Sequence, residues 1–112
     1  MTAEVRPITE DDALALSHLY PRWGIERCKK RIRKTLSSER QFRLVAVAGG
    51  NVVGHVYVKL GSMHHSHIAR ITSLVVDPQY RGQHIATQLL EKALEMLPAT
   101  IEIATLQVQL DN

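Results

Sequence analysis

Apolar positions change their spacing along the chain, and the first change separates a short strand from a helix. Residues 5–8 form a brief run typical of a strand. Thr9 stands three positions before Asp12, which is the spacing of a helix capping box. We therefore predict a helix from this point to about Tyr20.

A second helix is predicted from about Ile25, after a break at Pro21 and Gly24. Its apolar residues recur three and four positions apart, at Ile25, Cys28, Ile32 and Leu36. Basic residues stand between them in the run ERCKKRIRK. The helix therefore has one apolar and one charged side, and we expect it to lie on the surface.

From residue 42 onwards the apolar spacing is that of strands. Residues 42–48 and 52–60 are β-rich, and the glycines in the turn between them tolerate the positive φ of a tight hairpin. The two runs predict an antiparallel pair. A third run, at residues 69–76, ends before Pro78, which cannot continue a central strand.

The last two patterns are a helix and a strand. A helix that Pro98 ends is predicted by apolar residues four apart, at Ile85, Leu89, Ala93 and Leu97. Residues 105–111 alternate like a half-buried strand, with Leu106, Val108 and Leu110 on one side. The order β-α-α-β-β-β-α-β predicts an α+β fold in which helices flank a mixed sheet, as one domain over residues 1–112.

Composition agrees with one compact domain. Of the 112 residues 45% are hydrophobic and 22% are charged, an ordinary globular mixture. No run approaches the roughly 20 apolar residues of a membrane span, and no apolar signal segment follows Met1, so we expect a cytoplasmic protein without membrane contacts. The net charge of +3 is mild and aromatic residues are few, so nucleic-acid binding is not expected.

The stretch VVDPQYRGQHIATQLL has the chemistry of an anion site. A strand ends there at a proline turn, and a helix begins a few residues later. The first turn of a helix leaves up to four N–H groups unpaired and carries a partial positive charge, which favours phosphate. Arg81 adds charge, while Gly82 and Ala86 leave room for a ligand to approach the main chain. A glycine that simply permits the corner fits the same spacing.

These residues also resemble a known family. The stretch is similar to the signature of the GCN5-related N-acetyltransferases (the GNAT superfamily), in which an Arg/Gln-x-x-Gly-x-Gly/Ala pattern joins a strand to a helix. The matching residues are Arg81, Gly82, Gln83, Ile85 and Ala86. The order of elements agrees as well, and the resemblance implies a mainly antiparallel GNAT-like sheet.

The resemblance implies acetyl-CoA as cosubstrate. The pantetheine arm is expected along the strand, as an additional strand beside Leu74, Val75 and Val76. The pyrophosphate is expected on the loop and helix start, at Arg81, Gly82, Gln83, His84, Ile85, Ala86 and Thr87. His84 stands where the family usually has glycine, and its imidazole either donates to a phosphate oxygen or crowds it.

Family domains usually continue beyond the strand predicted at residues 105–111. They add a helix and further strands, often with a tyrosine that serves as general acid to the leaving thiolate. No residue of this sequence occupies that place. We therefore expect a C-terminally truncated GNAT fold lacking the usual last helix and strands, and a homodimer in which a second copy covers the exposed edge.

Attack by an amine requires a proton acceptor near the same strand. Thr72 and Ser73 offer hydroxyls, which hold a water more readily than they act as bases. The nearest titratable groups are His64, His65 and His67, which accept protons near neutral pH. The same histidines also fit a solvated loop. No metal site is expected, because no cysteine or carboxylate lies close by.

Three aromatic residues are further candidates for the acceptor cleft. His55 and Tyr57 share one face of their strand, and Trp23 lies in the loop between the first two helices, a region that often shapes the acceptor site in relatives. Each fits a packing role equally well.

The resemblance implies transfer of an acetyl group to a primary amine by direct attack, the reaction of an N-acetyltransferase. The alternative is a non-catalytic CoA-binding or assembly module on a truncated GNAT fold. The missing tyrosine favours this alternative. So does the absence of a carboxylate at residues 71–74, since many relatives place one on the strand before the cofactor loop. The acceptor is a small-molecule amine or a protein amine, and nothing in the sequence distinguishes the two.

Overall fold

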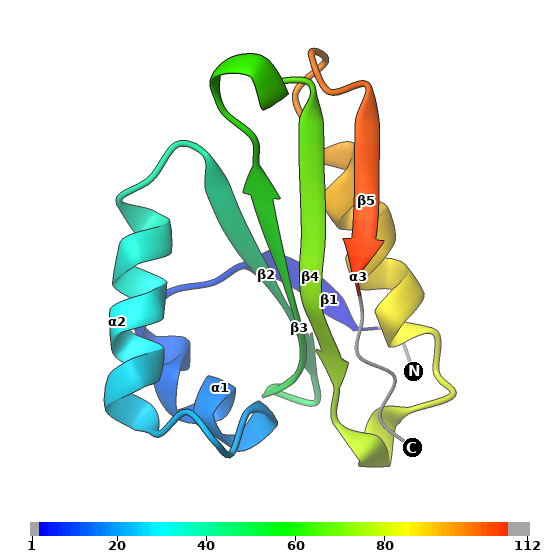
Figure 1. Cartoon of the computed structure of the whole chain (residues 1–112). Coiled ribbons are helices and arrows are strands. Elements are labelled where there is room, and N and C mark those ends of the chain that lie inside the picture. Colours follow the sequence, from blue (N-terminus) through cyan, green and yellow to red (C-terminus); the bar gives the residue numbers. More distant parts are fainter. Residues whose placement is uncertain (1–2, 108–112) are drawn as a thin grey trace.

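The computed structural model describes residues 3–107, which form one five-stranded sheet with helices on both faces (Figure 1). The strands are β1 (Glu4–Pro7), β2 (Gln41–Ala48), β3 (Asn51–Leu60), β4 (Ile68–Val76) and β5 (Ile103–Gln107). The helices are α1 (Ala13–Leu19), α2 (Ile25–Leu36) and α3 (Ile85–Glu95), with short 3₁₀ turns at Glu10–Asp12, Met63–His65 and Pro78–Tyr80. The predicted element order and α+β class are confirmed.

The strands follow one another across the sheet in sequence order, β1-β2-β3-β4-β5. Strands β1 to β4 are antiparallel neighbours, and β5 runs parallel to β4 after the crossover through α3. The predicted hairpin between β2 and β3 is confirmed, since Gly49 and Gly50 take φ values of 57° and 80°. The sheet is therefore mixed and mainly antiparallel, as predicted.

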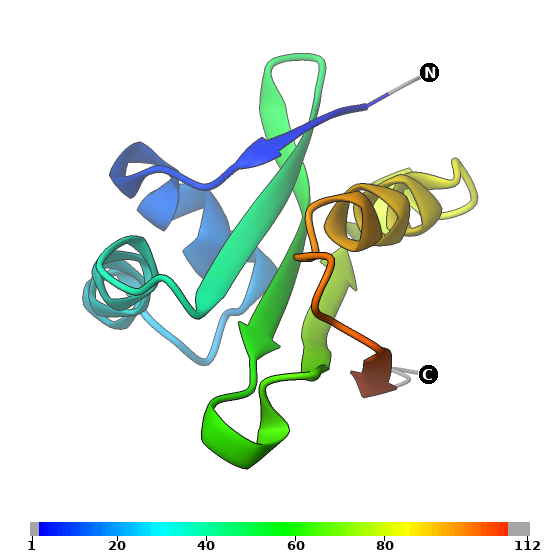
Figure 2. The ribbon, with the colours of Figure 1, turned by 90° about the horizontal axis from the view of Figure 1, so that it is seen from above.

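Helices on opposite faces give the protein two small cores (Figure 2). The face covered by α3 has one cluster of buried side chains, which includes Leu44, Val56, Ile71, Ile85, Leu89 and Ala93. The face covered by α1 and α2 has another, formed by Ile8, Ala13, Leu16, Cys28, Ile32 and Val45. Gly54 lets α3 lie close to the sheet, because a Cβ at that position would be 3.0 Å from Leu89 Cδ1.

The predicted capping box at Thr9 and Asp12 is confirmed, although a 3₁₀ turn precedes α1. The Asp12 carboxylate accepts a 2.7 Å hydrogen bond from the Thr9 N–H. It also pairs with both terminal nitrogens of Arg6, at 2.8 and 2.9 Å. Burial raises the pKa of Asp12, but the hydrogen bonds from Arg6 and Thr9 outweigh burial and lower it. These contacts fix the start of α1, and with it the loop that follows.

Some predictions about burial are wrong. Ile25 and Leu36 are 38% and 54% exposed, so the apolar side of α2 is shorter than its spacing predicts. Strand β5 is exposed along its described length, and Leu106 is 48% exposed, because no described layer covers that edge strand. Val108 and Leu110, which were expected on the same face, lie outside the described residues. Helix α3 ends at Glu95, before Leu97 and Pro98.

Candidate functional site

A β-bulge interrupts β4 at Ser73. His55 of β3 pairs with Val75, while Tyr57 pairs with Thr72, so one intervening residue of β3 faces two of β4. Ser73 takes a φ of 56°, a left-handed conformation found at the extra residue of one type of bulge. In the part of the chain that the structure describes, β5 pairs with β4 only as far as Thr72. Beyond the bulge, the outer edge of β4 therefore has no described partner strand.

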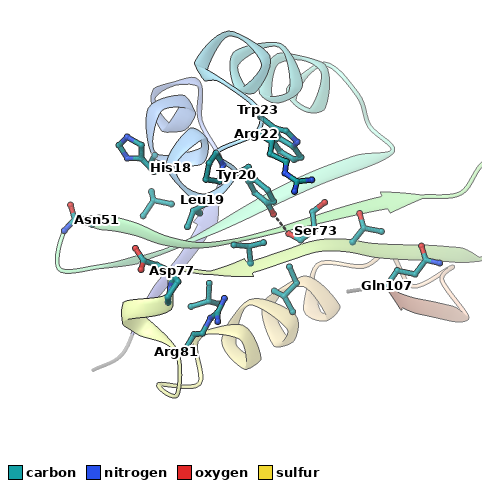
Figure 3. A pocket seen from close by; sticks show the side chains of 18 residues that line it. His18, Leu19, Tyr20, Arg22, Trp23, Asn51, Ser73, Asp77, Arg81 and Gln107 are labelled. Carbon is teal, nitrogen blue, oxygen red and sulfur yellow. Dashed lines mark hydrogen bonds between the residues drawn. The ribbon is translucent and has the colours of Figure 1, made fainter. Parts of the chain in front are cut away.

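Residues 72–76 line a cleft of about 1120 Å³ (Figure 3). The opposite wall comes from the end of α1 and the loop after it, including Tyr20, Arg22 and Trp23. Arg81 lines the end of the cleft toward α3. The cleft thus joins the bulged strand to the loop that leads into α3.

A chain of hydrogen bonds connects the bulge to the protein interior. The Tyr20 hydroxyl donates to the Ser73 carbonyl oxygen at 2.5 Å and lies 2.9 Å from His55 Nδ1. On the other side of the imidazole, His55 Nε2 lies 3.3 Å from Arg43 Nη1. A guanidinium group only donates, so Nε2 accepts and the proton resides on Nδ1. That N–H faces the Tyr20 oxygen and, at 3.3 Å, the Ser73 carbonyl oxygen.

Burial keeps His55 and Tyr20 uncharged. His55 is fully buried, and its desolvation together with the charge of Arg43 lowers its pKa to about 3. Desolvation raises the pKa of the Tyr20 hydroxyl. At neutral pH the imidazole is neutral and the phenol is protonated. This fixes which atoms donate and which accept at the Ser73 carbonyl, so the two side chains hold the bulge.

Arg43 anchors this network on the face covered by α2. Its Nε donates a 2.8 Å hydrogen bond to the Thr35 hydroxyl, and its guanidinium lies 4.0 Å from the centroid of the Tyr57 ring. Desolvation lowers the pKa of Arg43. His55 and Tyr57, candidates for the acceptor cleft on sequence grounds, belong to this buried support and do not line the cleft.

The loop before α3 brings together most of the residues predicted to bind phosphate. Gly82 has a φ of 81°, and His84, the N-cap of α3, has a φ of 63°. Glycine adopts such a conformation at less cost than histidine, so His84 is strained relative to the glycine that the resemblance implies at this position. No side chain caps the helix, so the N–H groups at its start remain available to an anion.

The predicted phosphate-binding residues differ in what they expose to a ligand. Arg81 lines the cleft. Ile85 is buried in the core beneath α3, so only its main chain is available there. The side chains of His84 and Thr87 are exposed, whereas Gln83 and Ala86 are half-buried. Leu74, Val75 and Val76, predicted to face the pantetheine arm, are half-buried and line the cleft.

The histidines predicted as proton acceptors lie away from the cleft. His64 and His65 are exposed in the 3₁₀ turn between β3 and β4, and His67 directly precedes β4. The cleft is lined by residues 72–76, at the other end of that strand. Thr72 and Ser73, the other candidates, do line it. Within residues 3–107, no three His, Cys, Asp or Glu side chains gather to hold a metal ion.

Tyr20 and Arg22 are among the cleft residues that were not predicted. Both belong to the sequence YPRWG, where Trp23 was the only candidate. The proline and glycine of this stretch signal a loop, which Tyr20 and Arg22 share with Trp23. The contact between Tyr20 and the Ser73 carbonyl could not be predicted from this stretch, because the two residues are 53 positions apart in the sequence.

None of the helices in residues 3–107 combines the length and the apolar character that crossing a membrane requires.

Comparison with solved structures shows similarity to acetyltransferases. A GNAT family acetyltransferase from Staphylococcus aureus is 18% identical, with a TM-score of 0.82, covering 98% of this chain and 89% of that chain. Glucosamine-6-phosphate N-acetyltransferase from Arabidopsis thaliana is 14% identical, with a TM-score of 0.83, covering 98% and 84%. The PaiA N-acetyltransferase from Thermoplasma acidophilum, in complex with coenzyme A, is 19% identical, with a TM-score of 0.69, covering 86% and 72%.

At these identities the structural similarity establishes the fold alone. No match was found among curated protein sequences. The family model "Acetyltransferase (GNAT) family", however, matches residues 7–112, nearly the whole chain. The bulged strand, the loop with Arg81 and Gly82, and the five-stranded sheet agree with that match, and the chain therefore belongs to the GNAT family of acetyltransferases.

Proposed function

We propose that this protein transfers an acetyl group from acetyl-CoA to a primary amine. The observation that carries the proposal concerns residues 73–76 of β4, whose outer edge has no partner strand within residues 3–107. They line the same cleft as Arg81, which stands in the loop that leads to the uncapped start of α3. An exposed strand edge can add an extended ligand arm through main-chain hydrogen bonds. A helix start beside an arginine favours phosphate. A pantetheine arm joined to a pyrophosphate requires these two features side by side.

The residues present fit this cosubstrate. Leu74, Val75 and Val76 would hold the pantetheine arm, and Arg81 with the main chain up to Thr87 would hold the pyrophosphate. When bound, acetyl-CoA supplies the acetyl group as a thioester. In the transfer, the amine nitrogen bonds to the carbonyl carbon and the carbon–sulfur bond breaks. The nitrogen loses one proton, and the thiolate gains one.

The network behind Ser73 prepares the reacting end of the cleft. Tyr20 and His55 both contact the Ser73 carbonyl oxygen, which restricts rotation of the peptide between Ser73 and Leu74. Main-chain groups that are fixed before the reaction stabilise developing charge better than mobile ones, because they do not reorganise during the reaction. We therefore place the thioester beside the bulge.

No strong base stands beside the bulge among the described residues. Asp77 is the only carboxylate that lines the cleft in residues 3–107, and it accepts a 2.9 Å hydrogen bond from the Gln79 N–H. The amine is therefore expected to attack from the fraction that is already neutral. The same observation favours the second candidate function, a non-catalytic CoA-binding module on this fold.

Two measurements separate these functions. Acetyl-CoA should raise the melting temperature of the protein, because a ligand that prefers the native state stabilises it. Acetyl transfer to a panel of primary amines is measured by release of the CoA thiol and by the mass of the acetylated product. If acetyl-CoA binds but no amine is acetylated, the protein is the non-catalytic CoA-binding module. If acetyl-CoA does not bind, both functions are contradicted.

A homodimer remains part of the proposal. Ile103 and Leu106, on the edge strand β5, are 49% and 48% exposed. Apolar side chains on an open edge favour association with another chain. Light scattering at micromolar concentration should give the mass of two chains, and a monomer would contradict this part of the proposal.

A further inference from the structure

The wall of the cleft opposite β4 is basic. Arg22 lines the cleft, and its side chain extends toward β4 in Figure 3. The Trp23 indole stacks on Tyr20, with ring centroids 4.1 Å apart. Around the same indole, the Cζ atoms of Arg31 and Arg27 lie 4.3 and 5.9 Å from the ring centroid. Of these three arginines only Arg22 lines the cleft, while Arg27 and Arg31 lie over the Trp23 ring, outside the lining.

The protein does not neutralise these three arginines in the part that the structure describes. No ion pair within 4.0 Å joins Arg22, Arg27 or Arg31 to a carboxylate of residues 3–107. The nearby acidic groups pair elsewhere, Glu26 with Lys29 and Glu10 with Arg33, each at 3.5 Å.

Arg31 is under-satisfied in hydrogen bonding as well as in charge. Its Nε is buried and has no hydrogen-bond partner among residues 3–107. The only carboxylate lining the cleft in the described part of the chain, Asp77, directly precedes the 3₁₀ turn that leads to Arg81. Arg22 on the wall, with Arg27 and Arg31 beside Trp23, therefore adds positive charge that no carboxylate of residues 3–107 pairs with.

Positive charge on this wall acts on an acceptor in two ways. A cleft focuses the field of its charges, so this wall attracts anionic ligands and repels cationic ones. It also disfavours the ammonium form of a bound amine, because like charges lie close together. The neutral amine is the form that attacks the thioester, so the second effect increases the reactive fraction.

We propose that the acceptor is a small primary amine that carries a phosphate or a carboxylate. Arg22 binds this anionic group, and Arg27 and Arg31 add to the positive potential around it. Guanidinium groups bind phosphate and carboxylate through paired, charge-assisted hydrogen bonds. The anionic group is unchanged in the reaction, and only the amine is acetylated. This proposal rests on the proposed acetyl transfer and names its substrate class.

Matched pairs of amines test the proposal. Phosphoethanolamine is compared with ethanolamine, and 4-aminobutyrate with butylamine, so each pair differs in its anionic group. Their affinities are measured by calorimetry, with and without saturating CoA. We expect the anionic member of at least one pair to bind about tenfold more tightly or better. This preference should shrink as NaCl rises from about 0.05 to about 0.5 M, because salt screens exposed charges.

Two variants identify the source of the preference. Arg22→Gln should reduce it toward equal affinities. Arg33→Gln also removes one positive charge, but from a different place. Arg33 is two residues after Arg31 in α2, so it lies on the opposite side of the helix, where it pairs with Glu10. This control should keep the preference.

The outcomes separate this proposal from the one on which it rests. Equal affinities within both pairs, or a preference that Arg22→Gln leaves unchanged, would overturn the anionic acceptor. Stronger acetylation of a polyamine or an aminoglycoside than of either anionic amine would overturn it too, while acetyl transfer itself would stand. Absence of CoA binding contradicts the proposed function instead, and the comparison made without CoA still decides the anion preference. The amine pair with the larger difference in affinity shows whether the site prefers phosphate or carboxylate.

Discussion

The Tyr20 hydroxyl donates a 2.5 Å hydrogen bond to the Ser73 carbonyl oxygen and so joins the loop after α1 to the bulge of β4. These two segments form opposite walls of the cleft. The bond therefore fixes the loop after α1, the proposed acceptor side, relative to the strand proposed to bind the cosubstrate. His55 contacts the same carbonyl from the interior at 3.3 Å.

Replacing Tyr20 by phenylalanine should weaken acetyl-CoA binding as well as stability. The change leaves the buried His55 Nδ1 with only its longer contact to Ser73, which should lower the free energy of unfolding by about 1–3 kcal/mol. A bulge that is less well held should also bind acetyl-CoA more weakly, which calorimetry measures.

Tyr57→Phe provides the matched control for this variant. It deletes the same atom, but the Tyr57 hydroxyl donates to Gln41 and lies outside the cleft. We expect it to lose stability and keep its acetyl-CoA affinity. If both variants bind acetyl-CoA as tightly as the wild type, Tyr20 does not position the cosubstrate strand.

Acid should destabilise the fold through His55. Its pKa in the folded protein is about 3, against 6.5 for an ordinary histidine, so between these values the unfolded state binds more protons. Stability should therefore fall as the pH drops through this range, by about 2 kcal/mol between pH 7 and pH 5. His55→Gln has no imidazole to titrate at this position, so its loss of stability between pH 7 and pH 5 should be smaller by that amount. Denaturant unfolding at the two pH values measures both proteins, and equal losses would rule out this role for His55.

Removal of the Arg81 side chain tests the phosphate end. Arg81→Ala should weaken CoA binding by about 1.5–3 kcal/mol, the range for hydrogen bonds to charged groups. Ala86→Asp should be worse, because it places a negative charge where phosphate is expected. Lys92→Ala, near the other end of α3 and paired with Glu95, removes a positive charge from the same helix and should leave affinity unchanged. Arg81→Ala with wild-type affinity would remove Arg81 from the site.

The rate of acetyl transfer should rise with pH and follow the acceptor. No carboxylate stands beside Ser73 in the described cleft, so the amine must already be neutral when it attacks. Replacing one acceptor by a close analogue with a lower amine pKa should move the rising limb of the pH–rate profile to lower pH. The shift should equal the difference between the two amine pKa values. A limb that stays at one pH for both acceptors would reveal a base on the enzyme.

Local patterns predicted most of the fold. The spacing of apolar residues placed α2, the β2–β3 hairpin and the turn before α3, because helix periodicity and turn chemistry depend on neighbouring residues. The position of the loop that contains Arg81 and Gly82 was predicted for the same reason, because its turn residues are adjacent in sequence. The exposure of Leu106 was not predicted, since alternation along a strand does not reveal whether a layer covers its apolar side.

The centre of the site depends on contacts between residues far apart in sequence. Thr72 and Ser73 were predicted for their hydroxyls, whereas the feature that shapes the cleft is the main chain at Ser73, with its φ of 56°. Nothing in the surrounding residues indicates a bulge. Tyr20 and His55 are 35 residues apart, and which residues meet across the sheet follows only from the strand register.

Hydrogen–deuterium exchange with and without acetyl-CoA tests most directly whether the cosubstrate lies along β4 and at the start of α3. We expect slower exchange at residues 73–76 and 81–87, and unchanged exchange at His64, His65 and His67. Acetyl-CoA binding that leaves the first two segments unprotected, or that protects the connection between β3 and β4 instead, would contradict the proposed site.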